Sequence, residues 1–377
     1  MSPTIVRGMT WEHERGYGSV VKAAEAYRSV APDVEVQWEY RSLQAFADQD
    51  LESLVEQYDL LVIDHPHIPV AAEDKLFTPL NGRGFDTELA TLATQSVGRS
   101  HESYQHLGQQ WGLALDAAAQ VAAYRPDLLE APPRTWPEVI ALAEEGRVLW
   151  PFKPVDSYSS LITIAAGLGE DPMATPGVFL SEDGLTRSME LLTRLARLVP
   201  ADNAGFNPIQ VADVLAESDT FAYSPLLFGY TNYSRAGYRS NRVQYIDIPS
   251  STRGLAGSLL GGAGIAVSSR SKVMDAAIAH AFWLASGDVQ ESSYYDGGGQ
   301  PGNAVAWESA RTNADSLDFF TGTRATLEGA YMRPRFATYI ELQNAVSPLV
   351  TSALLGEITI AELRERLDAG VAEWLVR

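Results

Sequence analysis

Side chains capable of binding or acid–base chemistry gather where two apolar strands are predicted to end. The sequence pattern predicts these strands at residues 4–9 and 58–64. At their ends come an indole, two imidazoles, a guanidinium and a carboxylate, which belong to Trp11, His13, Arg15, Asp64 and His65. Because ligands in open α/β sheets bind outside the carboxyl ends of the strands, we expect these residues at one binding site.

The histidines near these strand ends allow two kinds of chemistry. His13, His65 and His67 are three of the six histidines in the chain, and they can bind a metal ion or form an acid–base pair. The rings of residues 65 and 67 point in different directions, however, and no HExxH spacing exists. We therefore expect histidines that hydrogen-bond a ligand, with no metal site and no cofactor. No nucleophile elbow is present either, so we assign no catalytic residue.

Three tryptophans, Trp11, Trp111 and Trp150, lie in or next to predicted strand ends. An indole there can stack on the apolar face of a sugar and leave its hydroxyl groups free for hydrogen bonds. The alternative is core packing, as most of the eight tryptophans must pack. We expect ligand contacts from Trp11 and Trp111, and a Trp11→Ala variant that binds weakly but melts normally. Further polar candidates for the same site are Asp116, Tyr158, Tyr230 and Asn232.

Arg15 and Arg41 follow strand ends in a chain with 48 acidic residues. Two guanidinium groups can clamp an anion in bidentate fashion, which would make the ligand an acid sugar or a carboxylate. The alternative for each arginine is a surface ion pair. Gly262 precedes a buried strand, where a backbone without a side chain can approach a ligand or form a hinge. We keep Arg15, Arg41 and Gly262 among the candidate ligand-binding residues.

The elements that position these side chains follow a β-α-β-α-β order. Apolar residues at helical spacing predict helices over 17–30 and 43–57. Alternating apolar and polar residues predict a strand over 34–40, between the strands at 4–9 and 58–64. Short connections in this order imply a parallel sheet with right-handed crossovers.

Later segments add short strands and two clear helix starts. Residues 110–116 and 119–124 are each expected to be extended. Capping boxes at 135–138 and 359–362 each place a threonine three residues before a glutamate, which predicts a helix N-terminus at both places.

Composition excludes several classes of protein. At 377 residues the chain is long enough for two domains, and its 46% hydrophobic content is that of a globular protein. A formal net charge of −20 disfavours nucleic acid as a partner. The absence of cysteine excludes disulfides and thiol ligands, and no apolar run reaches the roughly 18 residues of a membrane span.

The order of these pieces resembles the extracellular solute-binding proteins of family 1, the sugar-binding group of ABC importers that includes maltose-binding protein. The resemblance covers nearly the whole chain. Its anchors are the strand 58–64, the segment 111–116, the helix start 135–138, and the strand 260–267 that leads into a helix over 274–286.

The resemblance implies an α/β fold of the periplasmic-binding-protein type II class, with two lobes that each hold a mixed sheet flanked by helices. Lobe one is expected to hold residues 1–112 and 258–304, and lobe two residues 113–257 and 305–377. A small polyhydroxylated ligand, a carbohydrate or an acid sugar, would bind in a cleft that closes by hinge motion, for import through ABC permease subunits. We expect a monomer.

Two other functions are compatible with the sequence. One is a cytoplasmic enzyme on the same scaffold, with His13, Asp64 and His65 as acid–base groups. The other is a cytoplasmic ligand sensor. The family normally carries a secretion signal and this N-terminus shows none, so we expect an extracytoplasmic protein if a leader has been removed and a cytoplasmic one if Met1 is the native start.

Overall fold

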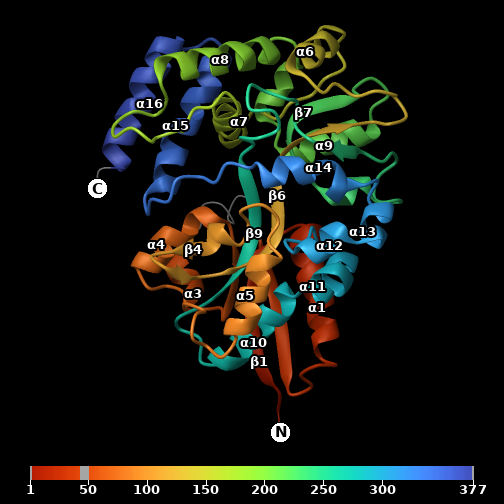
Figure 1. The fold of residues 1–377 in the computed structure, drawn as a ribbon, viewed down its shortest axis with the longest axis vertical. Helices are drawn as coiled ribbons and strands as arrows, with labels where there is room; N and C mark the ends of the chain where they lie inside the picture. Colours follow the sequence, from red (N-terminus) through yellow and green to blue (C-terminus); the bar gives the residue numbers. More distant parts are fainter. Residues whose placement is uncertain (1, 43–50, 376–377) are drawn as a thin grey trace. The chain divides into compact units, whose positions relative to one another are not determined.

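Residues 2–42 and 51–375 are described by the computed structural model, and the chain divides into two units (Figure 1). Unit 1 holds residues 1–118 and 261–313, and unit 2 holds residues 119–260 and 314–377. The three division points fall within β6 (Leu113–Tyr124), β9 (Leu260–Val267) and α13 (Ala310–Asp315). The sequence placed these points after residues 112, 257 and 304, which is 6, 3 and 9 residues earlier than 118, 260 and 313. That the two units act as lobes around a ligand stays a prediction.

The sheet of unit 1 is built around β3 (Leu60–Ile63), the predicted apolar strand. β1 (Thr4–Trp11) pairs in parallel with both β3 and β2 (Val34–Arg41), while β9 runs antiparallel on the other side of β3. The strand order is β2-β1-β3-β9-β6. The predicted parallel sheet is therefore confirmed for β1 to β3, and β9 makes the sheet mixed.

Helices bury both faces of this sheet, which explains why every residue of β3 is apolar. Leu60 and Val62 pack with α1 (Ser19–Tyr27) and α10 (Met274–Ala285), whereas Leu61 and Ile63 pack with α3 (Leu51–Val55) and α4 (Ile68–Glu73). Successive side chains of a strand point to opposite faces, so each face needs its own apolar pair. The remaining elements of unit 1 are η1 (Glu14–Gly18), η2 (His65–His67), α5 (Asp86–Thr94), η3 (Glu102–Tyr104), β4 (Gln105–His106), β5 (Gln109–Gln110), α11 (Gly287–Val289), η6 (Gln290–Tyr294) and α12 (Ala304–Glu308).

The first of the two helices predicted near the N-terminus is shorter than expected, and the second is described only in part. The helix expected over 17–30 is α1, preceded by the π-helical turn η1. Of the helix expected over 43–57, α3 forms the later part, and residues 43–50 lie outside the described residues.

Unit 2 has a small antiparallel sheet and a helical layer. The second half of β6 pairs with β7 (Tyr223–Phe228) and β8 (Gln244–Ile246), so the two extended pieces expected at 110–116 and 119–124 are one strand. In Figure 1, α7, α8, α15 and α16 pack together. The bounds of the helical elements are α6 (Trp136–Glu144), α7 (Pro154–Gly167), α8 (Glu182–Ala196), η4 (Ala201–Gly205), α9 (Pro208–Glu217), η5 (Thr231–Ser234), α14 (Phe319–Glu328), α15 (Tyr339–Leu354) and α16 (Ile360–Trp374).

Both predicted capping boxes begin helices. Glu138 accepts the backbone N–H of Thr135 at 2.9 Å, and α6 begins at the next residue. Glu362 accepts the backbone N–H of Thr359 at 2.8 Å and donates its own N–H to the threonine hydroxyl at 3.1 Å. Across the described ranges 2–42 and 51–375, no helix combines the length and apolar character that crossing a membrane requires.

Candidate functional site

The carboxyl ends of three strands meet at one edge of the unit 1 sheet. Trp11, the last residue of β1, lies opposite Arg41, the last residue of β2. β3 runs parallel to β1 and ends at Ile63, so Asp64 emerges at the same edge. The antiparallel β9 pairs Gly264 with Ile63, which puts its first residues there as well. The sheet thus gathers the residues that were predicted to follow these strands.

Arg15 and Asp116 form a buried, bidentate ion pair at this edge. The Nε atom of Arg15 donates to Oδ2 of Asp116 at 2.6 Å, and Nη2 donates to Oδ1. The side chains are 6% and 1% exposed, respectively. Both were predicted to bind ligand, and the alternative for Arg15 was a surface ion pair. The structure instead shows a buried pair in which each charge neutralises the other.

The environment of Asp116 shifts the pKa of its carboxyl group. Burial raises the pKa of the Asp116 carboxyl, the neighbouring Arg15 guanidinium opposes that rise, and the negative charge of Asp64 adds to it. The influence of Asp64 on Asp116 reflects the gathering of these carboxylates, from two distant segments, at the same edge.

Asp64 caps the short helix that follows β3. One carboxylate oxygen, Oδ1, accepts the backbone N–H of His65 at 2.8 Å and lies 3.2 Å from Nδ1 of the same histidine. The His65 ring is 1% exposed and packs edge-on against Tyr104, while the Asp64 side chain is 26% exposed. Asp64 is thus the more accessible of the two predicted binding residues.

His13 also acts as a cap, and this role fixes its tautomer. Its Nδ1 atom accepts the backbone N–H of Arg15 at 3.0 Å, at the start of η1. A neutral imidazole with Nδ1 as acceptor carries its proton on Nε2, which makes that nitrogen a hydrogen-bond donor. The half-buried ring therefore carries its N–H on Nε2, which is the donor chemistry predicted for a histidine at a ligand.

Arg41 is buried at the end of β2. Its residue is 7% exposed, and burial lowers the pKa of its guanidinium to about 10, with a smaller opposing influence from Tyr58. The group stays protonated at neutral pH, so the edge of the sheet keeps a buried positive charge beside Trp11.

The tryptophan rings take part in core packing. Trp11 is 5% exposed, and a Cβ atom added to Gly16 would lie 2.5 Å from its ring, so the backbone of η1 covers one ring face. Trp111 is 8% exposed and donates its ring N–H to the carbonyl of His106 at 2.9 Å. A Trp11→Ala variant should therefore lose core packing, which corrects the expectation of an unchanged melting temperature. Trp150, the third tryptophan near a predicted strand end, is fully buried, as core packing requires.

Gly262 holds β9 against the backbone of Asp116. Its φ is +107°, and an added Cβ atom would lie 2.3 Å from the Asp116 carbonyl oxygen. Only glycine fits such a conformation and such a close approach. The structure thus gives Gly262 a backbone-packing role at the predicted site.

Three predicted residues belong to unit 2. Tyr158 is fully buried in the core, with its hydroxyl 3.1 Å from that of Tyr339, and this packing accounts for its burial. Tyr230 precedes η5 and Asn232 lies within it, and they are 9% and 1% exposed. A ligand contact from these three residues stays a prediction.

The sequence-based list missed Gln300, which supports the site. Its side-chain amide donates to the carbonyl of Ala117 at 2.9 Å, and the adjacent Pro301 forms a bridge with Asp116. The contact of Gln300 with β6 joins residues far apart in sequence, so no local pattern marks it. Among the residues that the structure describes, no three His, Asp or Glu side chains come together as a metal site.

Known proteins share this fold at low sequence identity. No family model and no curated protein matches the sequence. Maltose-bound MalE3 of T. maritima aligns with a TM-score of 0.83 at 16% identity, over 98% of this chain and 99% of its own. Two ABC transporter solute-binding proteins align at 18% identity with a TM-score of 0.79. The one from Thermotoga lettingae is bound with α-D-tagatose and covers 99% of both chains.

The other, from Agrobacterium radiobacter, is in complex with ribitol and covers 99% of this chain and 98% of its own. Over nearly its whole length the chain therefore has the α/β fold of maltose-binding-like solute-binding proteins. The resemblance predicted from the sequence is confirmed at the level of the fold.

Proposed function

We propose that this protein captures a small polyhydroxylated ligand, a sugar or a sugar alcohol, as the solute-binding component of ABC-type import. The main support for this proposal is the fold that the chain shares with known solute-binding proteins. Three solved proteins that match nearly the whole chain are named with maltose, α-D-tagatose or ribitol. These ligands have several hydroxyl groups and no net charge, so they share one recognition chemistry.

The edge of the unit 1 sheet supports this proposal. Hydroxyl groups both donate and accept, so a site for them needs acceptors and donors side by side. Asp64 supplies a partly exposed carboxylate, and His13 supplies an Nε2 donor. A charged acceptor strengthens such hydrogen bonds.

The same edge favours a neutral ligand over an acid sugar. Arg15 was the residue expected to clamp an anion, but its Nε and Nη2 atoms bond Asp116. The pair has no net charge, and the Asp64 carboxylate at the same edge offsets the positive charge of Arg41, so these four side chains leave no net positive charge to hold an anion. We therefore place acid sugars behind neutral sugars as ligands.

Other parts of the expected function stay predictions. These are a ligand position between the two units, permease subunits as partners, and a monomeric state. The enzyme alternative gains no support from the solved proteins that share the fold, since those reported above are named with bound sugars or a sugar alcohol.

A thermal-shift screen tests the proposal. The purified protein is heated with neutral sugars, sugar alcohols, acid sugars and dicarboxylates, each over a concentration series. A ligand that binds only the folded state raises the melting temperature in a saturable way. We expect this from at least one neutral sugar or sugar alcohol, with weaker or no shifts from the acids. A shift from dicarboxylates alone would overturn the proposed ligand class.

A further inference from the structure

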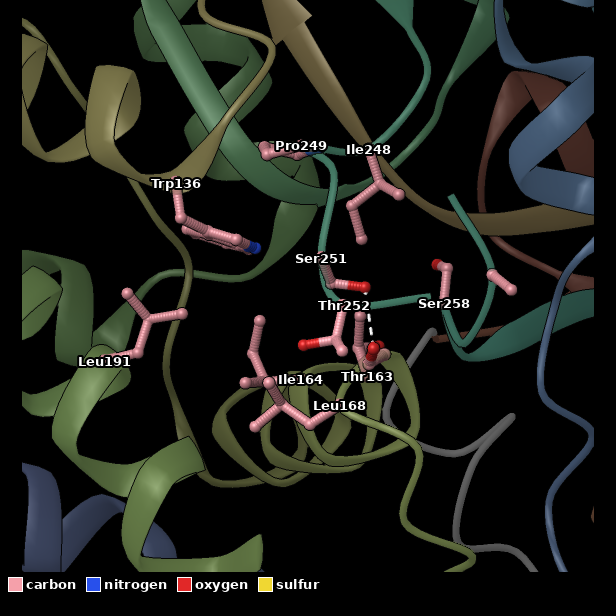
Figure 2. A pocket seen from close by; sticks show the side chains of 12 residues that line it. Trp136, Thr163, Ile164, Leu168, Leu191, Ile248, Pro249, Ser251, Thr252 and Ser258 are labelled. Atoms are coloured by element: carbon pink, nitrogen blue, oxygen red, sulfur yellow. Dashed lines mark hydrogen bonds between the residues drawn. The ribbon is translucent and has the colours of Figure 1, made fainter. Parts of the chain in front are cut away.

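A cavity of about 200 Å³ lies within unit 2, and its lining includes none of the residues proposed above to bind sugar (Figure 2). It is enclosed by α7, α8, the first residue of α6, and the segment 248–258 that leads to β9. An apolar cavity of about 150 Å³ is large enough to hold benzene, so this one has room for a substituted ring. Its apolar walls are formed by Trp136, Ile164, Leu168, Leu191, Ile248, Pro249 and Ala256.

Close backbone packing keeps the cavity in shape. Gly257 has a φ of +104°, and an added Cβ atom there would lie 2.4 Å from the backbone nitrogen of Gly167. Ser251 donates its hydroxyl to the Gly167 carbonyl at 2.7 Å. These contacts hold the segment 251–257 on the C-terminal turn of α7, so the space is part of the folded unit.

Most polar groups that line the cavity already have protein partners. The Thr163 hydroxyl donates to Gln120 at 2.6 Å and accepts the backbone N–H of Leu259 at 3.0 Å. Ser258 donates to the carbonyl of Gln120. Together with Ser251, these hydroxyls are satisfied within the protein and need nothing from a ligand.

Two polar groups differ from the rest. The indole N–H of Trp136 and the hydroxyl of Thr252 make no hydrogen bond to any described residue. Figure 2 shows the nitrogen at the end of the Trp136 ring that points into the cavity. Trp136 is half-buried and Thr252 is exposed, so these groups lie toward the side that solvent reaches.

The lining decides which chemistry fits. No ionisable side chain lines the cavity, so a charged ligand would lose its hydration without compensation. A sugar would bring many hydroxyl groups to a space with two unengaged partners. Waters inside would also be poorly bonded, since each needs two to four polar partners, and an apolar body gains by displacing them.

We propose that this cavity binds a small neutral molecule with an apolar ring and one hydrogen-bond acceptor, which accepts the indole N–H of Trp136. Thr252 provides a second, weaker polar contact at the mouth. The proposal does not depend on sugar binding elsewhere in the protein.

Three probes of nearly equal size test this chemistry: acetophenone, cumene and benzoate. They share a ring but carry, respectively, a neutral acceptor, no acceptor, and a charge. Saturation-transfer NMR on the full chain detects binding, and titration gives the affinities. We expect acetophenone to bind about 3- to 10-fold more tightly than cumene, as one neutral hydrogen bond allows, and benzoate not to bind.

Two variants locate the site. Trp136→Phe keeps the ring but removes the N–H, so acetophenone should lose its advantage while the affinity for cumene stays the same. Leu191→Trp fills the cavity from the half-buried face of α8 and should abolish binding of both. Trp283→Phe, at a half-buried tryptophan in unit 1, is the matched control and should bind like wild type.

Several results would overturn the proposal. These are no saturation transfer to acetophenone or cumene, benzoate binding as tightly as acetophenone, or binding that survives Leu191→Trp. Should Leu191→Trp fail to fold by circular dichroism, Trp136→Phe alone still decides, because an unchanged preference for acetophenone contradicts the assigned donor.

Discussion

The buried pair of Arg15 and Asp116 organises the candidate site at the scale of single residues. The two residues are 101 positions apart in sequence and join η1 to β6. Removing one partner of such a pair leaves an uncompensated buried charge, which costs about 3–5 kcal/mol. The pair is therefore better suited to holding the edge of the sheet in place than to exchanging partners with a ligand.

A substitution at Asp64 can remove a ligand contact while the fold stays intact. Asp64→Asn keeps the Oδ1 acceptor for the backbone N–H of His65 but removes the charge offered to a ligand. A hydrogen bond to a charged group contributes about 1.5–3 kcal/mol, so we expect sugar affinity to fall by at least tenfold with little change in melting temperature. Isothermal titration calorimetry measures the affinity.

The matched control for this variant is Asp59→Asn. Asp59 lies at the opposite end of β3, where it accepts hydrogen bonds from the backbone of Arg7 and the hydroxyl of Ser271. The Asp59→Asn variant should bind sugar as tightly as wild type does. Equal affinities for Asp64→Asn and wild type would remove Asp64 from the binding site.

Asp156 makes stability depend on pH. It lies in the first turn of α7, is 4% exposed, and its Oδ2 atom has no partner among the described residues. Burial raises its pKa from 3.8 to about 7, opposed in part by Lys153. Between these pH values the proton on Asp156 is bound only in the folded state. The stabilisation that this proton gives the folded state is therefore full below about pH 4 and is lost as the pH rises through about 7.

Asp156→Asn should remove this dependence. The free energy of unfolding of Asp156→Asn minus that of wild type should increase by on the order of 4 kcal/mol between pH 4 and pH 8, because the pKa shift of Asp156 affects wild type only. Urea unfolding at several pH values measures the difference. If the stability of Asp156→Asn stays parallel to that of wild type across this pH range, the role assigned to Asp156 is wrong.

At the scale of elements, the contact between β9 and β6 depends on Gly262. Alanine there would force a Cβ atom to within 2.3 Å of the Asp116 carbonyl oxygen at a φ of +107°. We expect Gly262→Ala to lower the free energy of unfolding by at least about 3 kcal/mol, since backbone strain and a clash add together. Denaturant unfolding measures the loss.

The Gly254→Ala variant measures the cost of backbone strain without a steric clash. Its φ is +69°, but no heavy atom lies within 4 Å of an added Cβ. It should cost only the roughly 1–2 kcal/mol of a left-handed conformation. Equal losses in the two variants would mean that the close approach to Asp116 contributes nothing.

Elements with a local signature could be predicted from the sequence, and contacts between distant segments could not. β3 was found because four apolar residues buried on both faces, bounded by Asp59 and Asp64, leave few other assignments. The capping boxes were found because cap and partner are three residues apart. Arg15 was not matched with Asp116, because nothing local relates η1 to β6. Burial of Trp11 likewise depends on how η1 folds back over its ring.

At the scale of the whole molecule, two strands and a helix carry the chain from one unit to the other. Unit 1 is interrupted after Ala118 and resumes at Gly261, so each unit is assembled from two separate stretches of sequence. Solved proteins with this fold include ones bound to maltose, α-D-tagatose and ribitol, and the net charge of −20 suits a solvated surface. The fold is thus shared with these proteins over nearly the whole chain.

The most direct test of this account is calorimetric titration of the purified chain with the neutral sugar or sugar alcohol that stabilises it most. The account predicts saturable binding of one molecule per chain, at least tenfold weaker in Asp64→Asn and unchanged in Asp59→Asn. Titrations that show no heat of binding with any neutral sugar or sugar alcohol, but saturable binding of an anionic metabolite, would contradict it.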